Sequence, residues 1–167
     1  MNVFISFSGA AREEFAIKFL NLYNQYGINC WYDQHELFLG DDLKKTIIQK
    51  GIETAEYCIL IINKTYLSRN WPCQEAIKLY EQLKGKKDSV IFPILLDITK
   101  EDIQNSELNF LLNIKYQFLH TGQDITPVAL QILNRIFHDI VEQSKFRTMD
   151  IALHYFKRLT LSDNIDI

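Results

Sequence analysis

The stretch YCILII, residues 57 to 62, is apolar at every position. A strand with one face in water alternates apolar and polar residues, whereas a parallel strand buried on both faces is apolar throughout. We therefore expect residues 57–62 to form a buried strand, with helices covering both faces of the sheet that contains it.

Further apolar runs occur on both sides of this stretch and alternate with segments of helical periodicity. The runs are VFISF (3–7), INCWY (28–32), SVIFPILL (89–96) and the alternating KYQFLH (115–120). Helical patterns cover 14–25, GDDLKKTIIQKGI (40–52), the segment beginning at WPCQE (71–75) and the segment after Thr126 and Pro127. This alternation predicts an α/β fold of the flavodoxin-like type: a five-stranded parallel sheet of order 2-1-3-4-5 with helices on both faces.

One residue conflicts with this strand order. Pro93 lies inside the fourth strand, which the order makes a central one, and proline cannot donate a hydrogen bond to a neighbouring strand. We expect a bulge or a strand end at this position. The stretch 97–113 predicts a long irregular connection that contains a short helix.

Two helices have faces that can be assigned from periodicity. For 73–84 we expect a buried face made of Cys73, Ala76, Ile77, Tyr80 and Leu83, with Glu75 pointing away from it. For the helix that Thr126 is expected to cap, the apolar positions share one face and are Ile132, Leu133, Ile136, Phe137 and Ile140.

Composition bounds the class of protein. With 167 residues, 47% of them hydrophobic, the chain is predicted to form one compact domain. A net charge of -3 and scattered basic residues give no reason to expect a nucleic acid or membrane partner. The apolar runs are too short to span a bilayer and the N-terminus lacks a signal-peptide pattern, so we expect a cytoplasmic protein. Three distant cysteines without a CxxC pair predict reduced thiols, two of them in strands.

The predicted topology locates a binding crevice. In open α/β sheets, ligands bind beyond the carboxyl ends of the strands, where the strand order reverses. That point lies between the first and third strands. The loops that leave these strands are Ser8–Ala11 and Asn63–Trp71, and the second loop leads to Glu75.

Several kinds of site are absent from the sequence. There is no GxxxxGK[ST] or GxGxxG motif, no GxSxG, and no acidic pocket after the first strand of the kind that a phosphoryl-accepting domain needs. The four histidines have no metal-binding spacing. The acidic group Asp33, Glu36, Asp41 and Asp42 is interpreted as a solvated loop with helix-start acids rather than as a cation site. We therefore expect no metal and no cofactor.

Three segments together resemble a known family. VFISFSGA (3–10), WYDQHELFLGDDLKKTI (31–47) and ILIINKTYLSRNWPCQEA (59–76) are similar, in order and spacing, to the signature boxes of a Toll and interleukin receptor (TIR) domain. The resemblance covers about residues 1–143. It implies NAD+ as substrate, self-association through TIR–TIR contacts, and a role in bacterial immune or cell-death signalling.

The same resemblance implies site residues. In NAD-cleaving members of the family a glutamate four residues after a tryptophan is catalytic, and Trp71 and Glu75 match this pattern. Similarity to the family also implies that Phe7, Ser8 and the loop Leu37, Phe38, Leu39, Gly40 line the nucleotide site. Some enzymatic members carry a basic residue directly after the first strand. This chain has Ser8 and Gly9 there, and Arg12 is the candidate replacement.

The chemistry of a lone glutamate fits this substrate. Loss of nicotinamide leaves positive charge on the ribose, which a carboxylate stabilises, and nicotinamide leaves as a neutral ring without needing an acid. An indole one helical turn away offers its face to the nicotinamide or to the cation. Because Glu75 is expected to point off the core, we expect the loop 34–42 or a neighbouring chain to cover it.

Other interpretations of the sequence remain open. An exposed glutamate in the first turn of a helix stabilises the helix dipole by ~0.3–1 kcal/mol, which requires no catalytic role. The chain is then a non-catalytic TIR interaction module, since many adaptor members lack the acid. A third class is a nucleoside-processing enzyme of similar architecture. Residues 144–167 predict an amphipathic helix or the start of a further region.

Overall fold

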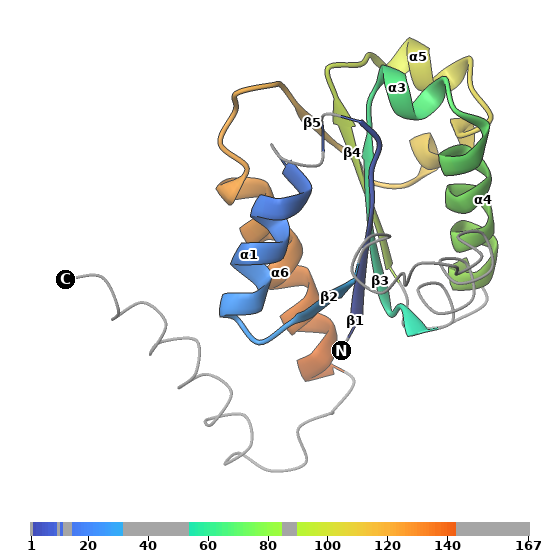
Figure 1. Ribbon diagram of the computed structural model, residues 1–167. Coiled ribbons are helices and arrows are strands. Elements are labelled where there is room, and N and C mark those ends of the chain that lie inside the picture. The colour runs from blue at the N-terminus through green and yellow to red at the C-terminus, as the bar shows by residue number, and fades with distance from the viewer. Residues whose placement is uncertain (1, 10, 12–14, 32–53, 85–89, 143–167) are drawn as a thin grey trace, which may run out of the picture.

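The central feature of the computed structural model is a five-stranded, all-parallel sheet of order β2-β1-β3-β4-β5, which confirms the predicted order (Figure 1). The structure describes residues 2–9, 11, 15–31, 54–84 and 90–142. Within these ranges the strands are β1 Asn2–Ser6, β2 Asn29–Trp31, β3 Tyr57–Ile62, β4 Val90–Leu96 and β5 Gln117–Leu119. The predicted bounds of β3 match these, and the ends of the other strands differ from the predicted ones by at most two residues.

Strand β3 is the centre of the fold. All six of its residues are buried, and it pairs with β1 on one side and β4 on the other. Alternate side chains point to opposite faces, so Tyr57, Ile59 and Ile61 join one hydrophobic cluster. Cys58, Leu60 and Ile62 join the other. One apolar hexapeptide therefore contributes to both cores of the protein.

Helices cover both faces of the sheet, as predicted (Figure 1). Helices α1 (Ile17–Gln25) and α6 (Thr126–Glu142) lie on one face. The other face carries α3 (Lys64–Leu67), α4 (Asn70–Lys84), α5 (Lys100–Gln104) and the 3-10 helix η3 (Asn109–Asn113). The Tyr23 hydroxyl of α1 donates a buried hydrogen bond of 3.0 Å to the Ala129 carbonyl, which ties α1 to α6.

Side chains stabilise the starts of α5 and α6. In α5, Thr99 and Asp102 form a reciprocal capping box, which satisfies backbone donors that the helix leaves open. The expectation that Thr126 caps the last helix was wrong. Helix α6 begins at Thr126 itself, and both the Thr126 N–H and its Oγ1 donate to the Asp124 carboxylate. Ile132, Leu133 and Ile136 are buried as predicted.

The position of Pro93 is explained by the shortness of β5. Pro93 lies in unbroken register with Leu60 of β3. The Val90 N–H donates to the carbonyl of Glu56, the residue before β3, and the Asp97 N–H donates to the carbonyl of Leu119 in β5. Residues alternate between neighbours along a strand, so the odd position 93 faces β5. Pairing with β5 begins only at Ile94, opposite Gln117. Strand β4 thus has neither a bulge nor an end at Pro93, and that expectation was wrong. The missing proline donor faces a position that β5 does not reach.

Three further expectations concern the chain as a whole. Cys30, Cys58 and Cys73 are free and buried, and the first two lie in strands as predicted. In the described ranges, no helix is both long and apolar enough to cross a membrane. The predicted helix at 40–52 and the segment 144–167 lie outside the described residues.

Candidate active site

The carboxyl ends of β1 and β3 lie side by side, at the point where the strand order reverses. Asn63, the residue after β3, links the two loops that leave these strands. Its Nδ2 donates to the Ser8 carbonyl at 3.3 Å, and its Oδ1 accepts the Tyr66 N–H at 2.8 Å. The second bond makes Asn63 the N-cap of α3. A single side chain thus fixes the loop after β1 against the helix that follows β3.

Tyr66 continues this connection into α4. It is fully buried, and its hydroxyl lies 2.8 Å from Ser6 Oγ and donates to the Pro72 carbonyl at 3.0 Å. Ser6 is the last residue of β1, and Pro72 lies in the first turn of α4, where proline is tolerated because its N–H is not needed. The start of α4 is therefore held at the end of β1 by buried hydrogen bonds.

Glu75 is buried in α4, with 6% of its surface exposed. The expectation that it points away from the core was wrong. Leu79 is fully buried and lies one turn further along, followed by Leu83 after another turn. Ile77 and Tyr80, which were assigned to the core face, are only partly buried. The buried face of α4 is thus rotated towards Glu75. A helical wheel that counts Leu79 among the apolar residues predicts this orientation.

The charge of Glu75 acts on its buried neighbours. Burial raises the pKa of the Tyr66 hydroxyl well above its usual range, against the lowering effect of the Ser6 hydrogen bond, and the Glu75 charge raises it further. Burial also raises the pKa of the Cys58 thiol, and Glu75 adds to that shift. With 6% of its surface exposed, Glu75 is covered by its own chain, without the neighbouring subunit that an exposed acid would need.

The residues implied by the family resemblance are only partly visible. Ser8 is buried, with 4% exposed, and among the described residues its Oγ has no hydrogen-bond partner. Phe7 is half-buried and packs against the cluster on the α1 and α6 face. Trp71 belongs to α4, one turn before Glu75, but its side chain lies outside the described part. Residues 37–40 and Arg12 also lie outside it.

The site contains residues that the sequence did not single out. Asn63 was detectable, because an asparagine between an apolar strand and a helical segment is a typical N-cap. Ser6 and Tyr66 carried no such signal, since their contact joins positions 60 residues apart. Among the described residues, no group of three or more His, Cys, Asp or Glu side chains is placed to hold a metal ion.

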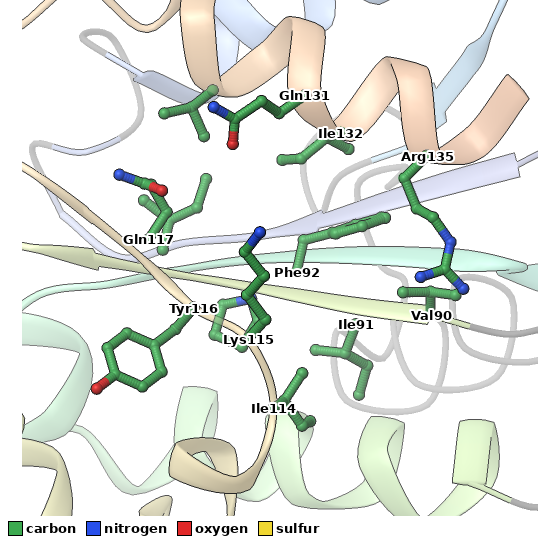
Figure 2. A pocket seen from close by; sticks show the side chains of 13 residues that line it. Val90, Ile91, Phe92, Ile114, Lys115, Tyr116, Gln117, Gln131, Ile132 and Arg135 are labelled. Atoms are coloured by element: carbon green, nitrogen blue, oxygen red, sulfur yellow. The ribbon is translucent and has the colours of Figure 1, made fainter. Parts of the chain in front are cut away.

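A separate cleft of about 350 Å³ lies where β5 fails to cover β4 (Figure 2). Its walls are the first residues of β4, the segment 114–117 and helix α6, with Phe92 and Ile132 on its apolar side. Lys115 and Arg135 also line it, and Arg135 pairs with Asp139 at 2.8 Å. Of the described residues that the sequence indicates for catalysis or substrate binding, none lines this cleft.

Comparison with known proteins agrees with the fold. A family model described as "TIR domain" matches residues 3–133. The chain belongs to the TIR domain family. This confirms the resemblance inferred from the three sequence segments.

Individual TIR relatives are moderately similar. A probable 2' cyclic ADP-D-ribose synthase of Methanobrevibacter olleyae is 31% identical over 103 residues, 62% of this chain and 29% of the relative. An NAD(+) hydrolase of a Theionarchaea archaeon is 31% identical over 105 residues, 62% of this chain and 31% of the relative. The chain thus matches less than a third of either protein. Among solved structures, the RPS4 and RRS1 TIR domain heterodimer has a TM-score of 0.57 at 20% identity, covering 83% of this chain and 98% of that one.

Proposed function

We propose that this TIR domain cleaves the bond between nicotinamide and ribose in NAD+, with Glu75 as the catalytic residue. The observation that carries the proposal is a buried carboxylate in α4, a helix whose first turn is hydrogen-bonded through Tyr66 to the end of β1, where the strand order reverses. The names of the two archaeal relatives, an NAD(+) hydrolase and a probable 2' cyclic ADP-D-ribose synthase, support this choice of substrate.

The reaction needs one acid residue. The bond between ribose C1' and the ring nitrogen breaks, and its electron pair leaves with nicotinamide, which becomes neutral. Positive charge develops on the ribose, and the Glu75 carboxylate stabilises it. Water then adds to C1' and loses a proton, giving ADP-ribose. If a hydroxyl of the same molecule attacks instead, the product is a cyclic ADP-ribose.

Burial determines how strongly Glu75 can act. A carboxylate ~4 Å from a unit positive charge contributes about 1 kcal/mol in water but about 4 kcal/mol at an effective dielectric of 20. The first value corresponds to roughly a fivefold rate increase and the second to about a thousandfold. Since Glu75 is enclosed by its own fold, the larger value applies within a single chain.

Substrate contacts are proposed for the residues around this acid. Ser8 supplies a buried hydroxyl that has no partner among the described residues, which suits a hydrogen bond to the substrate. Phe7, the Trp71 indole and the loop Phe38, Leu39, Gly40 are proposed to enclose the nucleotide, with Trp71 stacking on the nicotinamide. The domain is also proposed to self-associate through TIR–TIR contacts. The existence of a heterodimer of two TIR domains supports this proposal.

The direct test is incubation of the purified protein with NAD+, with products separated by chromatography. We expect free nicotinamide together with ADP-ribose or a cyclic isomer. If self-association contributes, the rate should rise more than linearly with protein concentration, and strict proportionality would count against that contribution. Absence of nicotinamide at every protein concentration would identify a non-catalytic interaction module. Cleavage of nucleosides but not of NAD+ would identify a nucleoside-processing enzyme.

A second prediction concerns Gly9, which with Ser8 directly follows the first strand, where the family resemblance implies a basic residue in some enzymatic members. Gly9 has φ +63°, and a Cβ there would lie 3.4 Å from Thr65 Cγ2. We expect Gly9→Ala to cost roughly 1–2 kcal/mol of unfolding free energy, because a side chain disfavours this conformation. It should also lower NAD+ turnover severalfold by shifting Ser8.

The matched control for this variant is Gly27→Ala. Gly27 has φ +69°, and nothing lies within 4 Å of a Cβ at that position. It should lose similar stability in a urea titration and keep full turnover. Equal turnover in the two variants would show that the loop after β1 has no part in the reaction.

A further inference from the structure

The Tyr66 hydroxyl is the middle member of a buried hydrogen-bond chain. It lies 2.8 Å from Ser6 Oγ and 3.0 Å from the Pro72 carbonyl. A carbonyl can only accept, so the Tyr66 proton goes to Pro72, and the Ser6 hydroxyl donates to the Tyr66 oxygen. Ser6, Tyr66 and Pro72 are all buried, which leaves little room for other arrangements of these donors and acceptors.

This chain joins three elements that carry the proposed site. Ser6 ends β1 and lies two residues before Ser8, while Tyr66 belongs to α3. Pro72 lies in the first turn of α4, three residues before Glu75, and residues three apart share one side of a helix. The position of the Glu75 turn relative to the end of β1 is therefore set through one phenolic oxygen.

Tyr66 is itself held from its backbone side. Its N–H donates to Asn63 Oδ1, and its carbonyl accepts a weak hydrogen bond from Cys73 Sγ at 3.5 Å. Because Tyr66 is fixed both at its backbone and at its hydroxyl, it holds α4 at a defined distance from the sheet. Catalysis is sensitive to this spacing, because a displacement of a catalytic group by ~1 Å can lower the rate a hundredfold.

We propose that Tyr66 is a positioning residue: its hydroxyl, held between Ser6 and the Pro72 carbonyl, places Glu75 for the cleavage reaction. The proposal rests on the proposed function of Glu75. It differs from a role in core packing, because it assigns the effect to one oxygen atom and not to the buried ring.

The molecule contains a matched control for that distinction. Tyr23 is also a fully buried tyrosine whose hydroxyl donates to a backbone carbonyl at 3.0 Å, that of Ala129. It lies on the opposite face of the sheet, in the cluster with α1 and α6. Tyr23→Phe and Tyr66→Phe therefore remove the same group from the same kind of bond, one of them remote from the proposed site.

The experiment compares the two variants with the parent protein in steady-state NAD+ cleavage. Both are expected to melt at lower temperature than the parent. In Tyr66→Phe we expect kcat to fall ten- to a hundredfold with KM within threefold of the parent, whereas Tyr23→Phe keeps kcat within twofold. Ser6→Ala removes the hydroxyl that donates to the Tyr66 oxygen and should lower kcat severalfold. A kcat in Tyr66→Phe and Ser6→Ala equal to that of Tyr23→Phe would overturn the proposal.

A readout that does not need turnover separates this proposal from the proposed function. The ¹³C carboxyl resonance of Glu75, assigned by its loss in Glu75→Gln, should shift in Tyr66→Phe and stay unchanged in Tyr23→Phe. If the parent cleaves no NAD+, the proposed function fails, while this shift still decides whether Tyr66 positions Glu75. An unchanged resonance in Tyr66→Phe would overturn the positioning role, even in an active enzyme.

Discussion

Glu75→Gln is expected to lower NAD+ turnover on the order of a thousandfold and to leave the fold intact. The substitution keeps the shape of the side chain and removes its charge. At an effective dielectric of 20, the lost attraction to a ribose cation ~4 Å away is about 4 kcal/mol, which sets the size of the effect. Release of nicotinamide by purified protein measures the loss, and a thermal melt checks the fold.

The control for this prediction lies in the same helix. Glu81 is exposed on α4, so Glu81→Gln changes the net charge by the same amount without touching the site. It should turn over NAD+ at the rate of the parent. Turnover in Glu75→Gln above a tenth of the parent rate would remove Glu75 from the mechanism and return it to the role of a buried structural acid.

Leu60→Ala is expected to destabilise the domain by roughly 2–5 kcal/mol, the range for deletion of a buried leucine side chain. Leu60 is fully buried in β3 and packs in the cluster beneath α3 and α4. Since a domain of this kind is stable by only about 5–15 kcal/mol, the variant should approach global unfolding. Urea titration followed by circular dichroism measures the change.

Leu130→Ala provides the comparison, because it removes the same atoms from an exposed position. Leu130 lies on α6 with 43% of its surface exposed. A change within about 0.5 kcal/mol is expected there, as for most surface substitutions. Similar losses in the two variants would mean that β3 does not form the doubly covered centre of the sheet.

The fold was predictable from local pattern, and the orientation of Glu75 was not. The hexapeptide 57–62 is apolar on both faces, and that property requires cover on both sides, whatever the details of packing. The buried face of α4 depends on which apolar residues are counted. A helical wheel that omits Leu79 from the apolar residues predicts that Glu75 points into solvent. In the structure, tertiary packing buries both residues.

The proposed site divides in the same way. Its place at the ends of β1 and β3 followed from strand order, and the pairing of Trp71 with Glu75 followed from family resemblance. The role of Tyr66 was not predictable, because it depends on contacts with Ser6 and Pro72. No spacing in the sequence indicates a contact between positions 60 residues apart. Ser8 was named, but its burial emerged only from the fold.

For this protein, the sequence by itself determined the parallel sheet, the order of its strands and the edge where a ligand is proposed to bind. These depend on hydrophobic periodicity and chain connectivity, which are local properties. Only the tertiary structure decided that Glu75 is enclosed and that α4 is tied to β1 through Tyr66. Burial and buried hydrogen bonds depend on which distant segments meet, and that is settled when the two hydrophobic clusters pack against the sheet.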